Sequence, residues 1–317
     1  MSGETSRALV LERFGSLPRL VERPVPEPRP GHTLVRVGVA QLDHLDLTVM
    51  SGKFRLLPDL PAVPGTAACG VVLASDTHPE GSLVRITGKG MGLTRDGCWA
   101  DHVLVPDAAA KAVPEGTNPA LACVFFSPLA TALAAVHAVA GVRPGERVVV
   151  TGAAGAVGGL TVQLAARAGA EVIGVVGRKT KLDHVPAPAA PVLAADLTAQ
   201  TAGGPVDVLI DTVGGAVLRG ALGLVRPRGR AALVGYTAGR DFAVDLGDFL
   251  LAEVALLPVN VLSRGREVAA DAERLLADLA AGELTLPIER YTPDRLAEAV
   301  ERLCTGEVIG KATLDLG

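Results

Sequence analysis

The pattern of apolar and polar positions changes about one third of the way along the chain. Before residue 120, short apolar stretches are separated by glycine and proline, and residues 33–39 alternate in hydrophobicity with a period of two. This alternation is typical of strands that bury one face. Further strands are predicted at residues 7–11, 70–73, 83–86 and 99–105. Glycine and proline between short strands indicate a small, mostly β domain.

After residue 120, compact β-branched runs alternate with apolar segments of helical spacing. This order predicts right-handed βαβ units and a parallel, doubly wound sheet. The proline-rich residues 187–191 predict one short crossover. The expected strands are 147–151, 171–176, 192–195, 206–211, 231–235 and 254–259. Near the end of the chain we expect helices at 267–279 and 294–304, followed by a strand at 312–316.

These patterns predict an α/β protein of two domains, which agrees with the chain length. The mostly β domain is expected to comprise residues 1–119 and 261–317, and the parallel-sheet domain residues 120–260. Residues 119–142 carry no Asp, Glu, Lys or Arg and are long enough to cross a membrane. Because Ser127, Pro128, Thr131 and His137 interrupt this segment and alanine supplies much of it, we expect buried helix there instead.

Charge and cysteine usage narrow the partners and the compartment. The chain has 30 Lys and Arg against 34 Asp and Glu, a net charge of −4, and no long basic run. Nucleic acids and anionic membranes are therefore not expected as partners. The four cysteines are far apart, and the N-terminal segment lacks the apolar core of a signal peptide. Free thiols in a reducing cytoplasm are the expectation.

A glycine-spaced turn follows the β-branched run at residues 148–150 and leads into a segment with helical spacing. In a strand–turn–helix unit of this kind, bare backbone N–H groups and a helix N-terminus can bind a dinucleotide pyrophosphate. Glycine matters because a Cβ would block close approach of the phosphate. A lone glycine pattern is weak evidence, but strand and helix patterns flank this one. The predicted binding residues are Gly152, Ala154, Gly155, Ala156, Val157 and Gly158.

The residues after the second strand of this unit indicate which dinucleotide binds. NAD-selective sites place Asp or Glu there, on the ribose 2′-hydroxyl. This chain has Gly177 and Arg178 instead, with Lys181 close behind. Since a guanidinium suits a 2′-phosphate, we predict NADPH as the cofactor. The alternative is a solvated basic helix start, which the helix dipole disfavours when no anion is bound.

Motifs along nearly the whole chain resemble the medium-chain dehydrogenase/reductase superfamily, zinc-independent quinone oxidoreductase type. The matching segments are 45–52, 61–72, 97–103, 128–132, 211–215 and 310–311. The resemblance implies a GroES-like catalytic domain and a Rossmann domain. It also implies further cofactor contacts at Asp46, Thr131, Thr212, Val213, Gly235, Tyr236 and Lys311.

The chain departs from the zinc-dependent relatives at their metal ligands. The resemblance places Asp43 at the first cysteine ligand, and Thr66 and Ala67 at a His-Glu pair. Without thiolate or imidazole there, a tetrahedral zinc site is not expected. Asp43, His44 and Asp46 are an alternative metal cluster, but three groups on one short loop offer poor geometry. A surface loop with a helix cap is the preferred interpretation, so we predict no metal.

The chain also lacks the tyrosine that some enoyl-thioester reductases of this superfamily carry after a Ser-Gly. Phe54 stands in the corresponding region, and a phenyl ring donates no proton. The two tyrosines are Tyr236 and Tyr291. Tyr236 follows a predicted strand and is expected at the carboxyl edge of the sheet, where it would pack on the cofactor or act as an acid.

The combined prediction is hydride transfer from NADPH to a quinone or an α,β-unsaturated carbonyl. Thr66, Tyr236 and His44 are the candidate catalytic donors, although threonine and histidine in such loops often have structural roles. A small, apolar, electrophilic substrate and a homodimer are expected. Two alternatives remain: a tailoring enoyl or ketone reductase acting on a polyketide-like intermediate, and a non-catalytic NADPH-binding sensor or partner protein.

Overall fold

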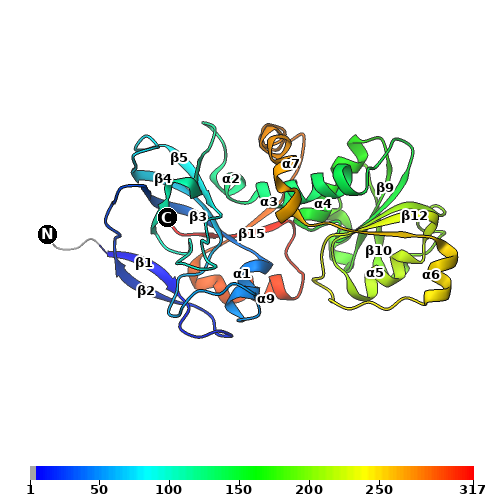
Figure 1. The fold of residues 1–317 in the computed structure, drawn as a ribbon, viewed down its shortest axis with the longest axis horizontal. Helices are drawn as coiled ribbons and strands as arrows, with labels where there is room; N and C mark the ends of the chain where they lie inside the picture. Colours follow the sequence, from blue (N-terminus) through cyan, green and yellow to red (C-terminus); the bar gives the residue numbers. More distant parts are fainter. Residues whose placement is uncertain (1–4) are drawn as a thin grey trace. The chain divides into compact units, whose positions relative to one another are not determined.

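The computed structural model describes the backbone of residues 5–317 and their side chains except that of Leu262. The chain forms two compact units (Figure 1). The first unit runs up to Phe125 and resumes at Ile288–Gly317, and the second unit is Phe126–Pro287. The α/β class, with one antiparallel and one parallel sheet, is as the sequence predicts.

The unit boundaries differ from the predicted domains mainly at residues 261–287, which belong to the second unit. The contacts of this segment explain the difference. Helix α7 (Val261–Arg274) packs on α3 (Phe126–Leu133). Farther along, Arg167 pairs with Asp278 at 2.5 Å, and the Gln163 side chain forms two hydrogen bonds with the backbone of Thr285.

The first unit is built on a seven-stranded sheet in the order β14-β15-β3-β4-β5-β7, with β6 also paired to β3. All its pairings are antiparallel except β14 with β15. Its strands are β3 (His32–Leu42), β4 (Ala67–Ala74), β5 (Leu83–Thr87), β6 (His102–Pro106), β7 (Ala110–Ala112), β14 (Ile288–Tyr291) and β15 (Lys311–Asp315). Strands β1 (Thr5–Val10) and β2 (Arg19–Pro24) form a separate antiparallel pair. The helices are α1 (His44–Met50), α2 (Pro119–Val124) and α9 (Leu296–Cys304), with short 3-10 turns at Asp107–Ala109 and Pro293–Arg295.

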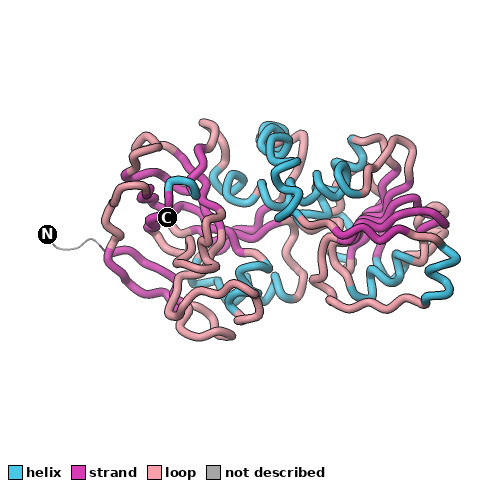
Figure 2. Tube along the Cα trace, in the orientation of Figure 1, coloured by secondary structure: helices cyan, strands magenta, loops and turns pink. Residues whose placement is uncertain are grey.

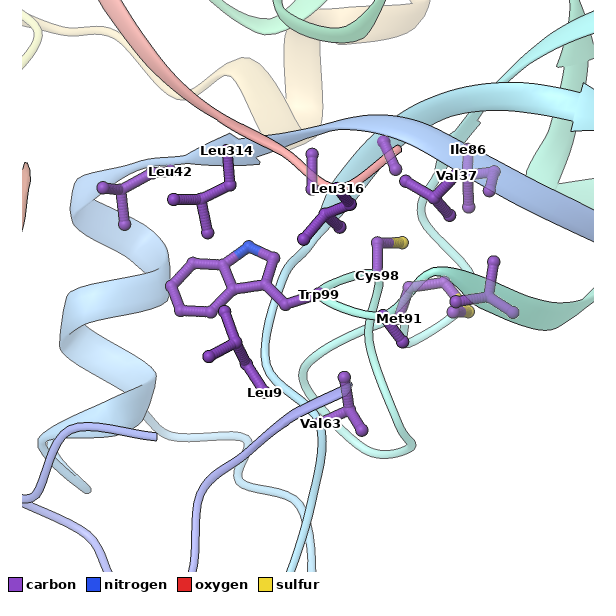
Figure 3. Packing of buried hydrophobic residues seen from close by; sticks show 14 of the residues in the cluster. Leu9, Val37, Leu42, Val63, Ile86, Met91, Cys98, Trp99, Leu314 and Leu316 are labelled. Atoms are coloured by element: carbon purple, nitrogen blue, oxygen red, sulfur yellow. The ribbon is translucent and has the colours of Figure 1, made fainter. Parts of the chain in front are cut away.

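Trp99 lies in the core of the first unit, where Leu9, Leu42 and Leu314 surround its ring (Figure 3). The ring is fully buried, and its Nε1 donates a hydrogen bond to the Gln41 carbonyl at 2.8 Å. Gly65 lies against this ring, and a Cβ there would overlap the indole. The indole therefore fixes the loop that leads into β4.

The second unit contains a six-stranded parallel sheet in the order β10-β9-β8-β11-β12-β13. This is the order of a Rossmann sheet. The strands are β8 (Arg147–Thr151), β9 (Glu171–Val176), β10 (Ala190–Leu193), β11 (Val206–Asp211), β12 (Val225–Leu233) and β13 (Ala255–Pro258). Besides α3 and α7, the helices are a π-helix at Ala134–Val139, α4 (Ala156–Arg167), α5 (Gly215–Leu222), α6 (Leu246–Ala252) and α8 (Leu276–Ala280), with 3-10 turns at Lys179–His184 and Ala194–Asp196. Helices α4 and α5 cover opposite faces of the sheet (Figure 2).

Most predicted strands are confirmed, and β8, β9 and β11 match to the residue. Strand β12 begins six residues before its prediction, and its pairing with β11 shifts register between Val206 and Val208. Residues 119–142 form buried helix, as predicted. Over the part of the chain that the structure describes, no helix is both long and apolar enough to cross a membrane.

Candidate functional site

The glycine turn joins β8 to α4 in a geometry that only glycine permits. Gly152 has a φ of +66°, and a Cβ there would overlap the Thr212 hydroxyl and lie 2.9 Å from Val213 Cγ1. A Cβ at Gly158 would overlap the Gly152 carbonyl group. The Gly155 N–H closes the turn by donating to the Gly152 oxygen at 2.8 Å. The first turn of α4 therefore packs directly against the end of β8.

The N-terminus of α4 presents its backbone N–H groups without a side-chain cap. Gly155 is the N-cap residue and has no side chain that could accept a hydrogen bond. Gly155, Ala156 and Val157 are only partly buried, whereas Ala153 and Ala154 are buried under the turn. Small residues and partial positive charge at a helix start suit a pyrophosphate. The residues present fit a dinucleotide.

Beside this turn, a hydrogen bond between two buried side chains joins the ends of β8 and β11. We call these two residues the Asp211–Thr151 pair. Thr151 Oγ1 donates to Asp211 Oδ1 at 2.6 Å, and both residues are fully buried. Asp211 Oδ2 accepts the Gly214 N–H at 2.8 Å, while Thr151 Oγ1 accepts the Thr212 N–H at 3.0 Å. Burial raises the pKa of Asp211, although these hydrogen bonds oppose the rise. The pair fixes the backbone of residues 212–214 next to Gly152.

The end of β12 joins the same edge. A Cβ at Gly235 would overlap the Thr212 carbonyl group, and the Val234 N–H donates to the Asp211 oxygen at 2.8 Å. Tyr236 follows with 60% of its surface exposed, and the Arg240 guanidinium lies 5.1 Å from its ring centre. The structure thus brings together Gly152, Thr212, Val213 and Gly235, with Tyr236 beside them.

The cations after β9 lie at the strand end nearest to the turn. The Ala153 N–H donates to the Val175 oxygen at 3.1 Å, which joins the turn to β9. Gly177 and Arg178 are exposed, and a Cβ at Gly177 would meet no atom within 4 Å. Lys181 lies in a 3-10 helix of six residues. A 3-10 segment this short has only a small dipole, so the dipole disfavours the cations Arg178 and Lys181 less than it would at the start of a long α-helix.

A second group of predicted residues meets in the first unit, at the start of α1. Asp43 is the N-cap residue, and its Oδ1 accepts the Leu45 N–H at 3.2 Å. Asp46 Oδ2 accepts the Asp43 N–H at 2.9 Å, which completes a capping box. The predicted helix cap is confirmed, but the expected surface loop is wrong for Asp46, which is 1% exposed.

Lys311 and Thr66 complete this group. The Lys311 ammonium binds Asp43 Oδ2, and both side chains are largely buried. Burial alone would raise the pKa of Asp43, but the Lys311 charge and hydrogen bond, together with His44 and the Leu45 N–H, outweigh burial and lower that pKa. The Thr66 hydroxyl and N–H each donate to Asp46 Oδ1 at 3.0 Å. Burial, and then the Asp43 charge, raise the pKa of Asp46 to about 7.

The donor set of this group does not match a metal centre. Zinc binds thiolates, neutral imidazoles and free carboxylates, whereas here Lys311 binds the Asp43 carboxylate. Burial raises the pKa values of Cys69, Cys98 and Cys123, which keeps them as thiols. Within residues 5–317, no three His, Cys, Asp or Glu side chains are grouped so that they could hold a metal ion.

The remaining predicted residues lie outside these contacts or at their edge. His44 is exposed at the first position of α1. Thr131 lies on α3, where its hydroxyl donates to the Ser127 carbonyl at 2.7 Å. Tyr291 is buried, donates to Glu289 at 2.6 Å and accepts from Arg302 at 3.0 Å. A structural role explains Tyr291 fully.

Sequence reasoning missed two features of these groups. It did not pair Lys311 with Asp43, which is 268 positions away. It also missed the roles of Thr151 and Asp211, although both lie in segments that it singled out. The available signal for the Asp211–Thr151 pair was a polar residue at the end of each of two buried strands. No local signal marked the pairing of Lys311 with Asp43.

Comparisons with known proteins agree with this architecture. The zinc-binding dehydrogenase family matches residues 156–278. The probable acrylyl-CoA reductase AcuI of Escherichia coli (strain K12) is 29% identical over 96% of this chain and 98% of its own length. A mycocerosic acid synthase-like polyketide synthase of Mycobacterium tuberculosis is 27% identical over 91% of this chain but only 14% of its own.

Two solved structures share the fold over 98% of this chain. An NAD-dependent alcohol dehydrogenase is 26% identical with a TM-score of 0.83, and the match covers 100% of its chain. A Pseudomonas syringae pv. Tomato DC3000 quinone oxidoreductase is 24% identical with a TM-score of 0.81, over 99% of its chain. These findings support the medium-chain dehydrogenase/reductase superfamily, quinone oxidoreductase-like branch, as the motifs indicate. They support an oxidoreductase of a superfamily that binds nicotinamide cofactors.

Proposed function

We propose that this oxidoreductase is zinc-independent, uses NADPH, and transfers hydride to a quinone or an α,β-unsaturated carbonyl. The observation that carries the proposal is the Lys311 ammonium on Asp43, the residue aligned with the first zinc ligand of metal-dependent relatives. An internal cation therefore neutralises that carboxylate. Without a Lewis acid, carbonyl reduction loses its activation, whereas conjugate addition needs only hydrogen-bond donors and a proton.

The choice of NADPH rests on the end of β9. A bound reduced nicotinamide would supply the hydride. The bare N-terminus of α4 would bind the pyrophosphate, and the Asp211–Thr151 pair would hold residues 212–214 against it. Arg178 and Lys181 follow β9 where NAD-selective sites carry an acid, which suits a 2′-phosphate.

Among the candidate donors to the acceptor, Thr66 is favoured. Its hydroxyl contacts a buried carboxyl, whereas His44 and Tyr236 are exposed. We expect a small, apolar, electrophilic acceptor. A hydroxyl and a proton, rather than a metal, would stabilise the negative charge that develops on its oxygen.

The test is NADPH oxidation by purified protein with a naphthoquinone, an alkyl enone and a simple ketone, with and without a strong metal chelator. We expect turnover of the naphthoquinone and the enone and little turnover of the ketone. The chelator should have no effect, and NADPH should be preferred over NADH. Loss of activity on chelation would contradict zinc independence. Binding of NADPH with no turnover of any acceptor would favour the rival of a non-catalytic NADPH-binding protein.

An enoyl thioester is the second candidate acceptor. It is favoured by the similarity to an acrylyl-CoA reductase and to a polyketide synthase. Phe54, where some enoyl-thioester reductases have tyrosine, argues against it. The same panel should therefore include acrylyl-CoA and the crotonyl thioesters of CoA and of N-acetylcysteamine. The kcat/KM values of these thioesters, relative to that of the enone, decide between the two classes of acceptor.

We also propose a cytoplasmic homodimer that associates through the second unit. Strand β13 is at the edge of its sheet, and the neighbouring α6 exposes Leu246, Leu250 and Leu251. The cysteines of the described chain are free thiols, as in a reducing compartment. Analytical ultracentrifugation tests the dimer, and substitution of Leu250 and Leu251 by serine should shift the protein to monomer. A wild-type monomer at micromolar concentration would contradict the proposal.

A further inference from the structure

Asp46 is a buried carboxyl that has no cation as its direct partner. Its Oδ2 accepts the Asp43 N–H at 2.9 Å, and its Oδ1 accepts the N–H and the hydroxyl of Thr66 at 3.0 Å. The nearby Lys311 ammonium binds Asp43 instead. Among the contacts of the described residues, Thr66 is the one side chain that hydrogen-bonds to the Asp46 carboxyl.

Three threonine–aspartate pairs among the described residues differ in how far the threonine is enclosed. Thr33 donates to Asp107 at 2.7 Å and Thr151 donates to Asp211 at 2.6 Å, and both threonines are fully buried. In the Asp46–Thr66 pair the acid is buried, while the threonine is only half-buried. The Thr66 hydroxyl therefore joins an enclosed carboxyl to a more open position.

We propose that the Asp46–Thr66 pair supplies the proton of the reaction, with Asp46 as the reservoir and Thr66 as the group that touches the acceptor. The inference rests on the proposed function and identifies its proton donor. Hydride adds to the β-carbon of the acceptor and leaves an enolate. When Asp46 is protonated, its carboxyl donates to Thr66 Oγ1 and the Thr66 hydroxyl hydrogen turns from Asp46 toward the acceptor. The Thr66 O–H bond breaks as its proton passes to the enolate, while the Asp46 proton passes to Thr66 Oγ1. Water then returns a proton to the Asp46 carboxylate, so each turnover consumes one hydride and one proton.

The electrostatic surroundings let Asp46 hold a proton near neutral pH. Burial is the largest cause, and the charge of Asp43 adds to it, so that the pKa of Asp46 lies at about 7. The Thr66 hydrogen bonds partly oppose the rise. The other titratable groups around the pair are His44 on α1, Lys311 on β15, Cys98 and Cys123. Lys311 offsets part of the Asp43 charge, and both thiols stay neutral.

The first experiment compares wild type with Thr66→Val, Thr66→Ser and the matched control Thr33→Val, using an α-substituted enone in D₂O. We expect Thr66→Val to lower kcat about 100-fold, the scale of one general acid, with little change in the Kd of NADPH. Deuterium should enter one face of the α-carbon in wild type and both faces in Thr66→Val. Thr66→Ser should restore both readouts, and Thr33→Val, if folded, should leave them unchanged.

The second experiment measures the pH profile of kcat. Wild type should lose activity as pH rises through about 7, because Asp46 then loses its proton. The Asp46→Asn variant should be slower and lack this titration. Unchanged deuterium stereochemistry and an unchanged profile in these variants, with wild type active, would overturn this inference alone. A wild type that binds NADPH and reduces no acceptor would overturn the proposed function and this inference with it.

Discussion

The two units each contain a buried aspartate bound by a threonine, yet the two pairs are built for different tasks. In the second unit, Asp211 and Thr151 are both fully enclosed, and their remaining hydrogen-bonding groups serve the backbone of residues 212–214. In the first unit, Asp46 is enclosed but Thr66 is half-open. The same two functional groups therefore give a fixed support in one place and, as proposed above, a proton path in the other. The two pairs differ in whether the threonine is enclosed: Thr151 is, and Thr66 is only half-buried.

The largest expected effect concerns the charge of Asp46. Because its pKa is raised to about 7, the folded chain keeps a proton that the unfolded chain releases near its ordinary pKa of 3.8. The free energy of unfolding should therefore fall as pH rises between these values, by roughly 4 kcal/mol in total. In Asp46→Asn this fall should be absent. Urea unfolding followed by circular dichroism at pH 5 and pH 7 checks it, and an unchanged slope in the variant would contradict the assigned burial effect.

Removal of the neighbouring cation should have the next largest effect. Lys311→Met leaves the Asp43 carboxylate without its partner and should cost on the order of 3 kcal/mol at pH 7. Since Lys311 lowers the pKa of Asp43, this stabilisation is present above the ordinary carboxyl pKa and is lost as pH falls below it. The difference from wild type should therefore shrink in acid. The exposed Lys111 gives a control, Lys111→Met, whose unfolding midpoint should barely move.

A third prediction compares the two threonines directly. Thr151→Val should cost about 2 kcal/mol, because Asp211 loses a donor and the Thr212 N–H loses its acceptor in an enclosed place. NADPH binding should weaken as well. Thr66→Val should cost less, since Asp46 keeps the Thr66 N–H and the site is half-open. Thermal unfolding and fluorescence titration with NADPH measure both. Equal losses in the two variants would remove the distinction between the pairs.

The smallest expected effect is on cofactor choice. Arg178→Ala should raise the Kd for NADPH about tenfold and leave that for NADH nearly unchanged, because one charge-assisted contact to a 2′-phosphate is lost. Arg274→Ala, on α7, where the guanidinium pairs with Asp271, is the control. If both dinucleotides weaken equally, Arg178 does not discriminate between them.

The difference between the units also explains what the sequence could predict. The glycine turn, β8, β9 and the cations after β9 are adjacent along the chain, and their residue types follow local backbone needs. Gly152 and Gly158 are such positions, since a Cβ at either would overlap a neighbour. Local pattern was therefore sufficient to predict the strand–turn–helix unit that the structure shows.

The group around Asp46 depends on strand pairing far apart in sequence. Ala312 on β15 lies opposite Leu42 on β3, and this register brings Lys311 to Asp43. No periodicity encodes that register. The observed unit boundary differs from the predicted domain boundary for a related reason, because the contacts of Asp278 and Thr285 with α4 are long-range. Strand β2 was missed because half of its residues are charged and most of them are exposed.

The Trp99 indole, which lies against Gly65, makes the fluorescence of the protein a probe of one loop. Trp99 is the one tryptophan of the chain, it is fully buried, and the loop that it fixes leads directly into Thr66. Its emission therefore reports on the first unit and on no other part of the molecule. Reduced nicotinamides absorb where tryptophan emits, so energy transfer from Trp99 would measure how closely a bound dinucleotide approaches this loop.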